Sequence, residues 1–141
     1  MIDIRIGPSI PIADIKHLWD QIPFSRGRDP ESIRLALQET DLLVHAWDDK
    51  RLVATARVIT DGVYYATIWD VIVDPGYQLK GVGRDVMRRA VEPFLGRGFS
   101  FIALFSAENK EPFYERLGFR PHGRGMILDE SRWPFSAHGE E

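Results

Sequence analysis

The fold of this chain is decided by residues 71–84, which read Val71-Ile72-Val73-Asp74-Pro75-Gly76-Tyr77-Gln78-Leu79-Lys80-Gly81-Val82-Gly83-Arg84. An apolar strand runs into a turn and then into a loop punctuated by glycines. That loop opens a helix with an apolar face, formed by Val82, Val86, Ala90, Val91 and Phe94. Backbone N–H groups point outward at such a helix start, the helix dipole is positive there, and glycine leaves no Cβ in the way. The stretch therefore predicts a site for a diphosphate, and hence for a nucleotide-bearing cofactor.

Length and composition indicate one ordinary globular domain. The chain has 141 residues, a formal net charge of -3 and no cysteine. The charge argues against a nucleic-acid partner, and the lack of cysteine excludes disulfides, thiolate metal sites and a cysteine nucleophile. The four histidines are scattered, so no metal is expected. Because no apolar run is long enough for a membrane span and no signal-peptide pattern is present, the sequence predicts a cytoplasmic protein without a membrane partner.

The periodicity of apolar residues predicts the elements around the glycine loop. Alternation in residues 2–6 indicates a strand, and two helices follow, over about 12–21 and from Pro30 behind an Asp29 N-cap. An antiparallel run comes next, with strands at 42–47, 52–60 and 63–73. Beyond the glycine loop and its helix we expect a strand at 99–105, a short helix at about 109–117 and a closing hairpin at 119–130. The almost unbroken apolar run 99–105 is typical of a central strand buried on both faces.

The predicted order is β-α-α-β-β-β-α-β-α-β-β, an α/β (α+β) arrangement. A central, mixed, mostly antiparallel twisted sheet with helices on both faces would bury it. A dinucleotide-binding fold does not fit, because three antiparallel strands precede the glycine loop. A kinase-type P-loop fails as well, because no Gly-Lys-Ser/Thr follows the glycines. We expect one domain over residues 1–130 and a C-terminal tail over 131–141.

Two blocks of the chain resemble the GCN5-related N-acetyltransferases, the GNAT family. Residues 78–83 match the family signature Q/R-x-x-G-x-G/A, and residues 113–119, Phe-Tyr-Glu-Arg-Leu-Gly-Phe, resemble its F-Y-x-x-L-G-F block. The element order fits too, so the resemblance covers nearly the whole chain. Residues 66–75 look most like plant and cyanobacterial members assigned to serotonin (arylalkylamine) acetylation.

The resemblance implies direct transfer of an acetyl group from acetyl-CoA to a primary amine within a ternary complex. The strand that holds Val73 would splay from the strand at 99–105 to admit the pantetheine arm of acetyl-CoA. The family often carries Asn where this chain has Ala107, so Asn109, two residues later, is the candidate for that contact. The expected cofactor-binding residues are Ile72 and Val73 for the pantetheine, Gln78, Leu79, Lys80, Gly81, Val82, Gly83 and Arg84 around the diphosphate, and Asn109.

Two residues are the candidates for catalysis. Tyr114, in the second block, could give a proton or a hydrogen bond to the departing CoA thiolate; alternatively it is a core aromatic paired with Phe113. Asp70 is an acid inside an apolar strand, which is costly unless the carboxylate is paired or faces a wet cleft. It could bind the ammonium of the acceptor or take its proton; alternatively it forms a structural ion pair with an arginine such as Arg57.

The identity of the amine is the least specific part of the prediction. Phe24, Trp69 and Asp70 are the expected substrate-binding residues, and an aromatic pocket would suit a small arylalkylamine, although strand aromatics are more often core residues. A protein N-terminus or lysine as acceptor, and a non-catalytic sensor that binds acetyl-CoA, both stay open. A homodimer is the expected assembly.

Overall fold

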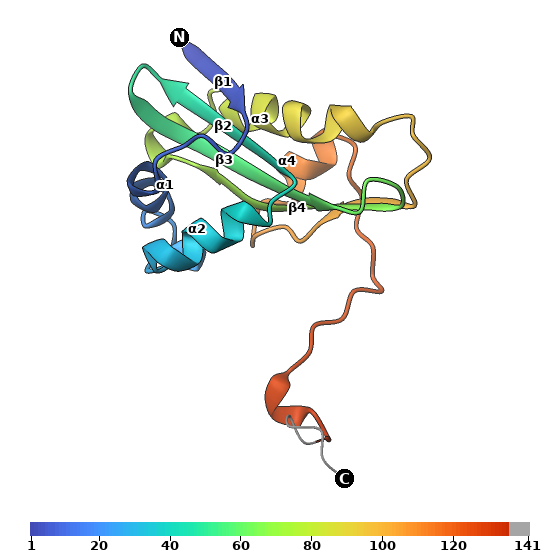
Figure 1. The fold of residues 1–141 in the computed structure, drawn as a ribbon. Helices are drawn as coiled ribbons and strands as arrows, with labels where there is room; N and C mark the ends of the chain where they lie inside the picture. The colour runs from blue at the N-terminus through green and yellow to red at the C-terminus, as the bar shows by residue number, and fades with distance from the viewer. Residues whose placement is uncertain (136–141) are drawn as a thin grey trace.

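The computed structural model describes residues 1–135 and contains a five-stranded sheet in the order β1-β2-β3-β4-β5 (Figure 1). Its strands are β1 (Ile2–Ile6), β2 (Leu42–Asp48), β3 (Arg51–Thr60), β4 (Tyr65–Val73) and β5 (Phe101–Leu104). The first four strands pair antiparallel, and β5 pairs parallel with β4. The predicted mixed, mostly antiparallel sheet is therefore confirmed.

Helices cover both faces of this sheet, as predicted. They are α1 (Ile12–Trp19) and α2 (Pro30–Gln38) on one face, and α3 (Val82–Val91) and α4 (Glu111–Arg116) on the other (Figure 1). The Asp29 carboxylate accepts hydrogen bonds from the N–H groups of Glu31 and Ser32, at 3.0 and 3.2 Å, so α2 begins at the expected N-cap.

Each face of the sheet has its own apolar core. Val86, Ala90 and Phe94 pack beneath α3 together with β3 and β4. On the other face, Leu18, Trp19 and Ile33 from α1 and α2 pack with Ile72 of β4. The site described below lies where β4 passes between these two cores. Among residues 1–135, no helix is long and apolar enough to cross a membrane.

The C-terminal part of the chain differs from the prediction. Residues 119–130 form no strand, so the expected closing hairpin is absent from the described residues. Pro121, Gly123 and Gly125 interrupt this segment and give it little strand propensity. This segment contacts β5 through a side chain: the rings of His122 and Phe101 lie 5.5 Å apart.

β5 is consequently an edge strand within the described residues, and the interpretation of 99–105 as a central strand is wrong. Phe101 is 50% exposed and Phe105 is 61% exposed. Beyond α4 the chain runs away from the sheet in Figure 1, and residues 120–135 are exposed throughout. Residues 136–141 of the predicted tail lie outside the described residues.

Candidate active site

The site begins where the sheet comes apart. β4 and β5 pair from Tyr65↔Phe101 to Ile68↔Leu104, and the rest of β4, residues 69–73, has no β5 partner. On its other edge β4 stays bonded to β3 as far as Val73. The predicted splay between these strands is therefore present, and it leaves one backbone edge of residues 69–73 free to pair with an extended ligand.

A bulge in β4 lies at the same place. Thr55 of β3 pairs with Ile72 and Arg57 pairs with Trp69, so a single β3 residue lies opposite two residues of β4. Asp70 has a φ of 50°, in the left-handed region, which aspartate tolerates better than most residues. Ile68 packs in the α3 core and Ile72 in the α1/α2 core. The extra residue therefore turns two consecutive side chains, Trp69 and Asp70, toward the α1/α2 face.

The turn after β4 is held by Asp74, whose side chain is 4% exposed. Its carboxylate accepts hydrogen bonds from Arg51 Nη2 at 2.6 Å and from the Gly76 N–H at 2.8 Å. Burial alone would raise the pKa of Asp74, but these bonds outweigh it and the pKa is lowered. The turn that leads into the glycine loop is thus fixed to the start of β3.

The glycine loop presents backbone where a diphosphate would bind. Leu79 and Gly81 have φ values of 66° and 83°, and α3 then begins at Val82 without a side-chain cap. The N–H groups of the first turn of α3 therefore have no intrahelical partner. A Cβ on Gly83 would lie 3.4 Å from both Phe113 and Val73, so this glycine lets α3 approach α4 and β4 closely. These features fit the diphosphate of acetyl-CoA.

The side chains of the loop take different positions relative to its backbone. The Arg84 guanidinium lies beside Gly81, 3.3 Å from where a Cβ would stand, whereas the Lys80 ammonium lies 5.9 Å above the Tyr77 ring. Gln78 donates a hydrogen bond to the Val73 carbonyl at 3.2 Å, at the end of the free strand edge. The Gln78 and Arg84 side chains thus lie against the backbone that would bind acetyl-CoA, at Val73 and Gly81 respectively. Asn109 has a φ of 67° and an exposed side chain in the turn before α4.

Tyr114 lies on α4 and is 8% exposed, in edge contact with Phe113 at a ring distance of 4.9 Å. Burial raises the pKa of Tyr114 to about 12, so the phenol stays protonated at neutral pH. Within residues 1–135, no fully buried polar side-chain atom lacks a partner. The Tyr114 hydroxyl donates to none of these residues, so it is free to act on a ligand as far as the described part of the chain is concerned.

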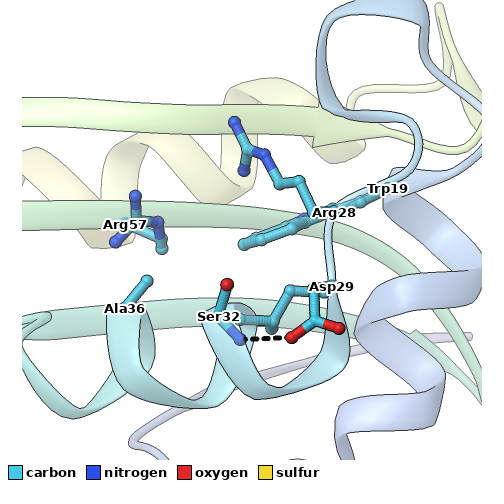
Figure 2. Close-up of a pocket in the computed structure, with 7 residues that line it drawn as sticks. Trp19, Arg28, Asp29, Ser32, Ala36 and Arg57 are labelled. Atoms are coloured by element: carbon cyan, nitrogen blue, oxygen red, sulfur yellow. Dashed lines mark hydrogen bonds between the residues drawn. The ribbon is translucent and has the colours of Figure 1, made fainter.

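A cavity of about 390 Å³ opens on the α1/α2 face, next to the bulge (Figure 2). The residues that line it are Trp19, Arg28, Asp29, Ser32, Ile33, Ala36 and Arg57. Asp70 is not part of this lining but contacts two of its residues: its Oδ2 lies 2.8 Å from Arg57 Nε and 3.0 Å from Arg28 Nη1. The ion pair with Arg57 is the structural alternative that the sequence left open for Asp70. In this structure Arg57 and Arg28 both form ion pairs with the Asp70 carboxylate.

The aromatic pocket expected from the sequence is only partly formed. Trp69 lies at the break, 5.7 Å from the Phe105 ring, while Phe24 is 55% exposed and is not part of the cavity lining. Sequence reasoning missed Trp19 and Arg28. Arg28 directly precedes the N-cap of α2, a position from which a side chain can reach over a cavity, but nothing in the sequence pairs it with Asp70.

Comparisons with known proteins agree with this geometry. The acetyltransferase (GNAT) family model matches residues 12–119. The chloroplastic GCN5-related N-acetyltransferase 1 of Arabidopsis thaliana is 45% identical over 88% of this chain and 65% of its own length. Rice (Oryza sativa subsp. japonica) chloroplastic serotonin N-acetyltransferase 2 is 36% identical over 91% of this chain and 67% of its own length. A histone acetyltransferase of soybean (Glycine max) is 30% identical over 85% of this chain and 56% of its own length.

These relatives correct one prediction. The expectation of a cytoplasmic protein is contradicted, because the Arabidopsis and rice relatives are chloroplast proteins. The chain spans about two thirds of the length of those two relatives.

A solved acetyltransferase of the GNAT family from Streptococcus pneumoniae has the same fold. It superposes with a TM-score of 0.78 at 27% identity, over 91% of this chain and 97% of its own. The family match extends over most of the chain and includes both the glycine loop and the block around Tyr114. This chain therefore belongs to the GNAT family of acetyltransferases and is an acyltransferase enzyme.

Proposed function

We propose that this enzyme transfers an acetyl group from acetyl-CoA to a small primary amine, with both substrates bound at once. One observation carries the proposal. The unpaired part of β4 runs from Trp69 to Val73, just before the glycine loop, and contains Asp70, whose carboxylate contacts Arg57 and Arg28 of the cavity lining. A thioester lying along this free edge could therefore meet an amine bound near Asp70.

The backbone is the main binding surface for acetyl-CoA in this proposal. N–H groups from Leu79 to Arg84 would hold the diphosphate at the start of α3, with the Arg84 guanidinium beside them. Ile72 and Val73 would pair with the pantetheine arm along the free edge of β4. Acetyl-CoA supplies an activated thioester carbonyl when it is bound there.

Tyr114 is assigned the role of donating a hydrogen bond to the sulfur of CoA as it departs. A pKa of about 12 keeps its phenol protonated at neutral pH, and a thiol has an ordinary pKa of about 8.5, so a hydrogen bond to the thiolate costs less than complete proton transfer. Asp70 is assigned the binding of the acceptor amine, because its carboxylate contacts Arg57 and Arg28, two residues that line the cavity.

The test is a thiol-release assay with acetyl-CoA and four groups of acceptors: arylalkylamines, polyamines, amino acids and short peptides. The rice relative named for serotonin favours the first group, and the soybean relative named for histones favours the last. Turnover with arylalkylamines at least tenfold above the other groups supports the proposal. Turnover with peptides alone would mean that the acceptor is a protein and not a small amine. Tight acetyl-CoA binding without thiol release for any acceptor group would indicate a sensor.

We also retain the homodimer as a proposal, with the segment after α4 meeting a second copy. Met126, Ile127 and Leu128 are 93%, 83% and 61% exposed, and β5 offers a free edge. Light scattering of the wild type and of Ile127→Asp decides it: a dimer that dissociates in the variant is expected, and a monomeric wild type rules it out.

A further inference from the structure

The Asp70 carboxylate has more positive charge around it than it needs. Its Oδ2 lies 2.8 Å from Arg57 Nε and 3.0 Å from Arg28 Nη1. Arg57 alone neutralises Asp70, so Arg28 leaves the group of three with one positive charge in excess. The Arg28 side chain is 36% exposed, and an ion pair made by a partly exposed cation contributes little to stability.

The two arginines are held very differently. Arg57 has a side chain that is 13% exposed, and it also donates to Thr40 Oγ1 at 2.8 Å. Thr40 in turn is fixed to the Ala36 carbonyl at 2.9 Å. The Arg28 side chain is 36% exposed, and within residues 1–135 it forms the ion pair with Asp70 without a hydrogen bond of good geometry. Arg57 is therefore the built-in partner, and Arg28 is the weakly held one.

The backbone around Arg28 is anchored without help from its side chain. Lys16 Nζ donates to the Arg28 carbonyl at 3.0 Å, and the Gly27 N–H donates to Asp20 Oδ1 at 2.9 Å. Asp29 is fixed as the N-cap of α2. The guanidinium can therefore leave Asp70 while the loop stays in place.

The place that Arg28 fills has the chemistry of an ammonium site. Its guanidinium carbon lies 4.9 Å from the centre of the Trp19 ring, and its Nη1 lies 3.0 Å from the buried Asp70 carboxylate. An aromatic face together with a carboxylate is a typical recognition site for an organic cation. Figure 2 shows the Arg28 guanidinium beside Trp19 and pointing away from α2, at the edge of the 390 Å³ cavity.

We infer that Arg28 occupies the ammonium subsite of the acceptor and that a cationic amine must displace it from Asp70 and Trp19. This inference rests on the proposed function and deepens it: the acceptor enters as a protonated amine with an apolar body, and Arg28 sets its apparent affinity. Because Arg28 and the ammonium carry the same charge, the exchange leaves the charge of the subsite unchanged.

The test uses Arg28→Gln, with Arg28→Lys as the conservative variant. Arg26→Gln is the matched control, since Arg26 lies on the same loop but donates to the Asp20 carbonyl instead. The acceptors are phenethylamine and phenylalanine, which differ by one carboxylate. For Arg28→Gln we expect the KM for phenethylamine to fall about threefold to tenfold, because the amine no longer has to displace Arg28 from Asp70 before it binds. The kcat and the KM for acetyl-CoA stay unchanged. Arg28→Lys keeps the charge but loses the planar group over Trp19, so its KM for phenethylamine should lie between those of the wild type and Arg28→Gln.

A binding arm separates this inference from the proposed function. Phenethylguanidine is too weakly nucleophilic to be acetylated, and calorimetry in the presence of CoA measures its affinity directly. We expect it to bind Arg28→Gln about threefold to tenfold more tightly than the wild type, and we expect this gain to disappear when Asp70→Asn is added. If the wild type acetylates none of the small amines in the acceptor panel, the proposed function fails, and this binding arm decides the inference alone.

Two outcomes would overturn the inference. A higher KM for phenylalanine in Arg28→Gln, with phenethylamine unchanged, would make Arg28 a residue that binds the anionic group of the acceptor. Weaker binding of phenethylguanidine by Arg28→Gln, with a lower melting temperature than Arg26→Gln, would make the Arg28–Asp70 pair purely structural.

Discussion

Both halves of β4 have β3 as a neighbour on one side, but only the first half is paired with a strand on the other. Residues 65–68 pair with β5, and residues 66–68 also pair with β3. The buried members of this half, Ala66 and Ile68, are 0% and 2% exposed. Residues 69–73 pair with β3 alone and contain the bulge at Asp70. The regular half stabilises the sheet, and the irregular half exposes the backbone and side chains that a ligand can use.

The irregular half is strained, and its neighbours hold it in place. A non-glycine residue in the left-handed region costs on the order of 1 kcal/mol. Thr55 Oγ1 donates to the Asp70 carbonyl at 3.1 Å and accepts from Trp19 Nε1 at 3.0 Å, while Arg57 binds the Asp70 side chain. Strain that so many contacts maintain is typical of a functional position.

The largest expected effect comes from blocking the glycine loop beyond the irregular half. Gly81→Glu places a negative side chain at a φ of 83°, where the diphosphate would lie. We expect acetyl-CoA affinity, measured by calorimetry, to fall by about a thousandfold, ~4 kcal/mol. Gly96→Glu is the matched control: its φ is 74° and nothing lies within 4 Å of a Cβ there, so it carries similar backbone strain and should bind acetyl-CoA normally. Equal affinities in the two variants would remove the loop from the site.

A cavity in the regular half should cost stability alone. Ile68→Ala removes a buried side chain that is 2% exposed, and we expect the free energy of unfolding to fall by about 3 kcal/mol. The measurement is denaturant unfolding, with Leu95→Ala at a 57% exposed position as the control. Acetyl-CoA affinity of the folded variant should stay within about twofold of the wild type. A loss of affinity as large as the loss of stability would break the division between the two halves.

Tyr114 tests the chemistry assigned to the free edge. Tyr114→Phe keeps the packing against Phe113 and removes the hydroxyl, so kcat should fall about tenfold or more with little change in acetyl-CoA affinity. Tyr65→Phe, at a 52% exposed position in the regular half, is the control and should keep full turnover. Unchanged turnover and an unchanged pH–rate profile in Tyr114→Phe would leave that residue a role in packing only.

The smallest expected effect is a loss of stability at low pH, and it should arise from His45 in the regular part of the sheet. His45 of β2 accepts from Trp47 Nε1 at 2.7 Å, and its Nε2 lies 3.0 Å from the Gly7 carbonyl. Burial lowers its pKa below the ordinary 6.5. The unfolded chain then binds a proton more readily, so the free energy of unfolding should decline as the pH falls below about 6.5. His45→Gln should flatten that decline in unfolding experiments, with His17→Gln as the control; the same slope in both would exclude His45.

The sequence predicted the regular parts of the molecule well, because each has a local signal. The N-cap at Asp29, the alternation along β1 and the glycines before α3 all act within a few residues. It missed what depends on distant partners. The bulge at Asp70 arises from the register with β3, and the exposure of β5 arises because residues 119–130 form no strand. Arg28 and Trp19 join the site only through the packing of α1 and α2.

The difference between the two halves of β4 can be measured directly by amide hydrogen exchange with and without saturating acetyl-CoA. We predict slower exchange for those amides of residues 69–73 that do not donate to β3, and for residues 79–84, by about tenfold or more. Residues 66–68, already paired on both sides, should exchange at the same rate in both samples. Bound acetyl-CoA without protection at 69–73, or with equal protection in both halves, would contradict the account.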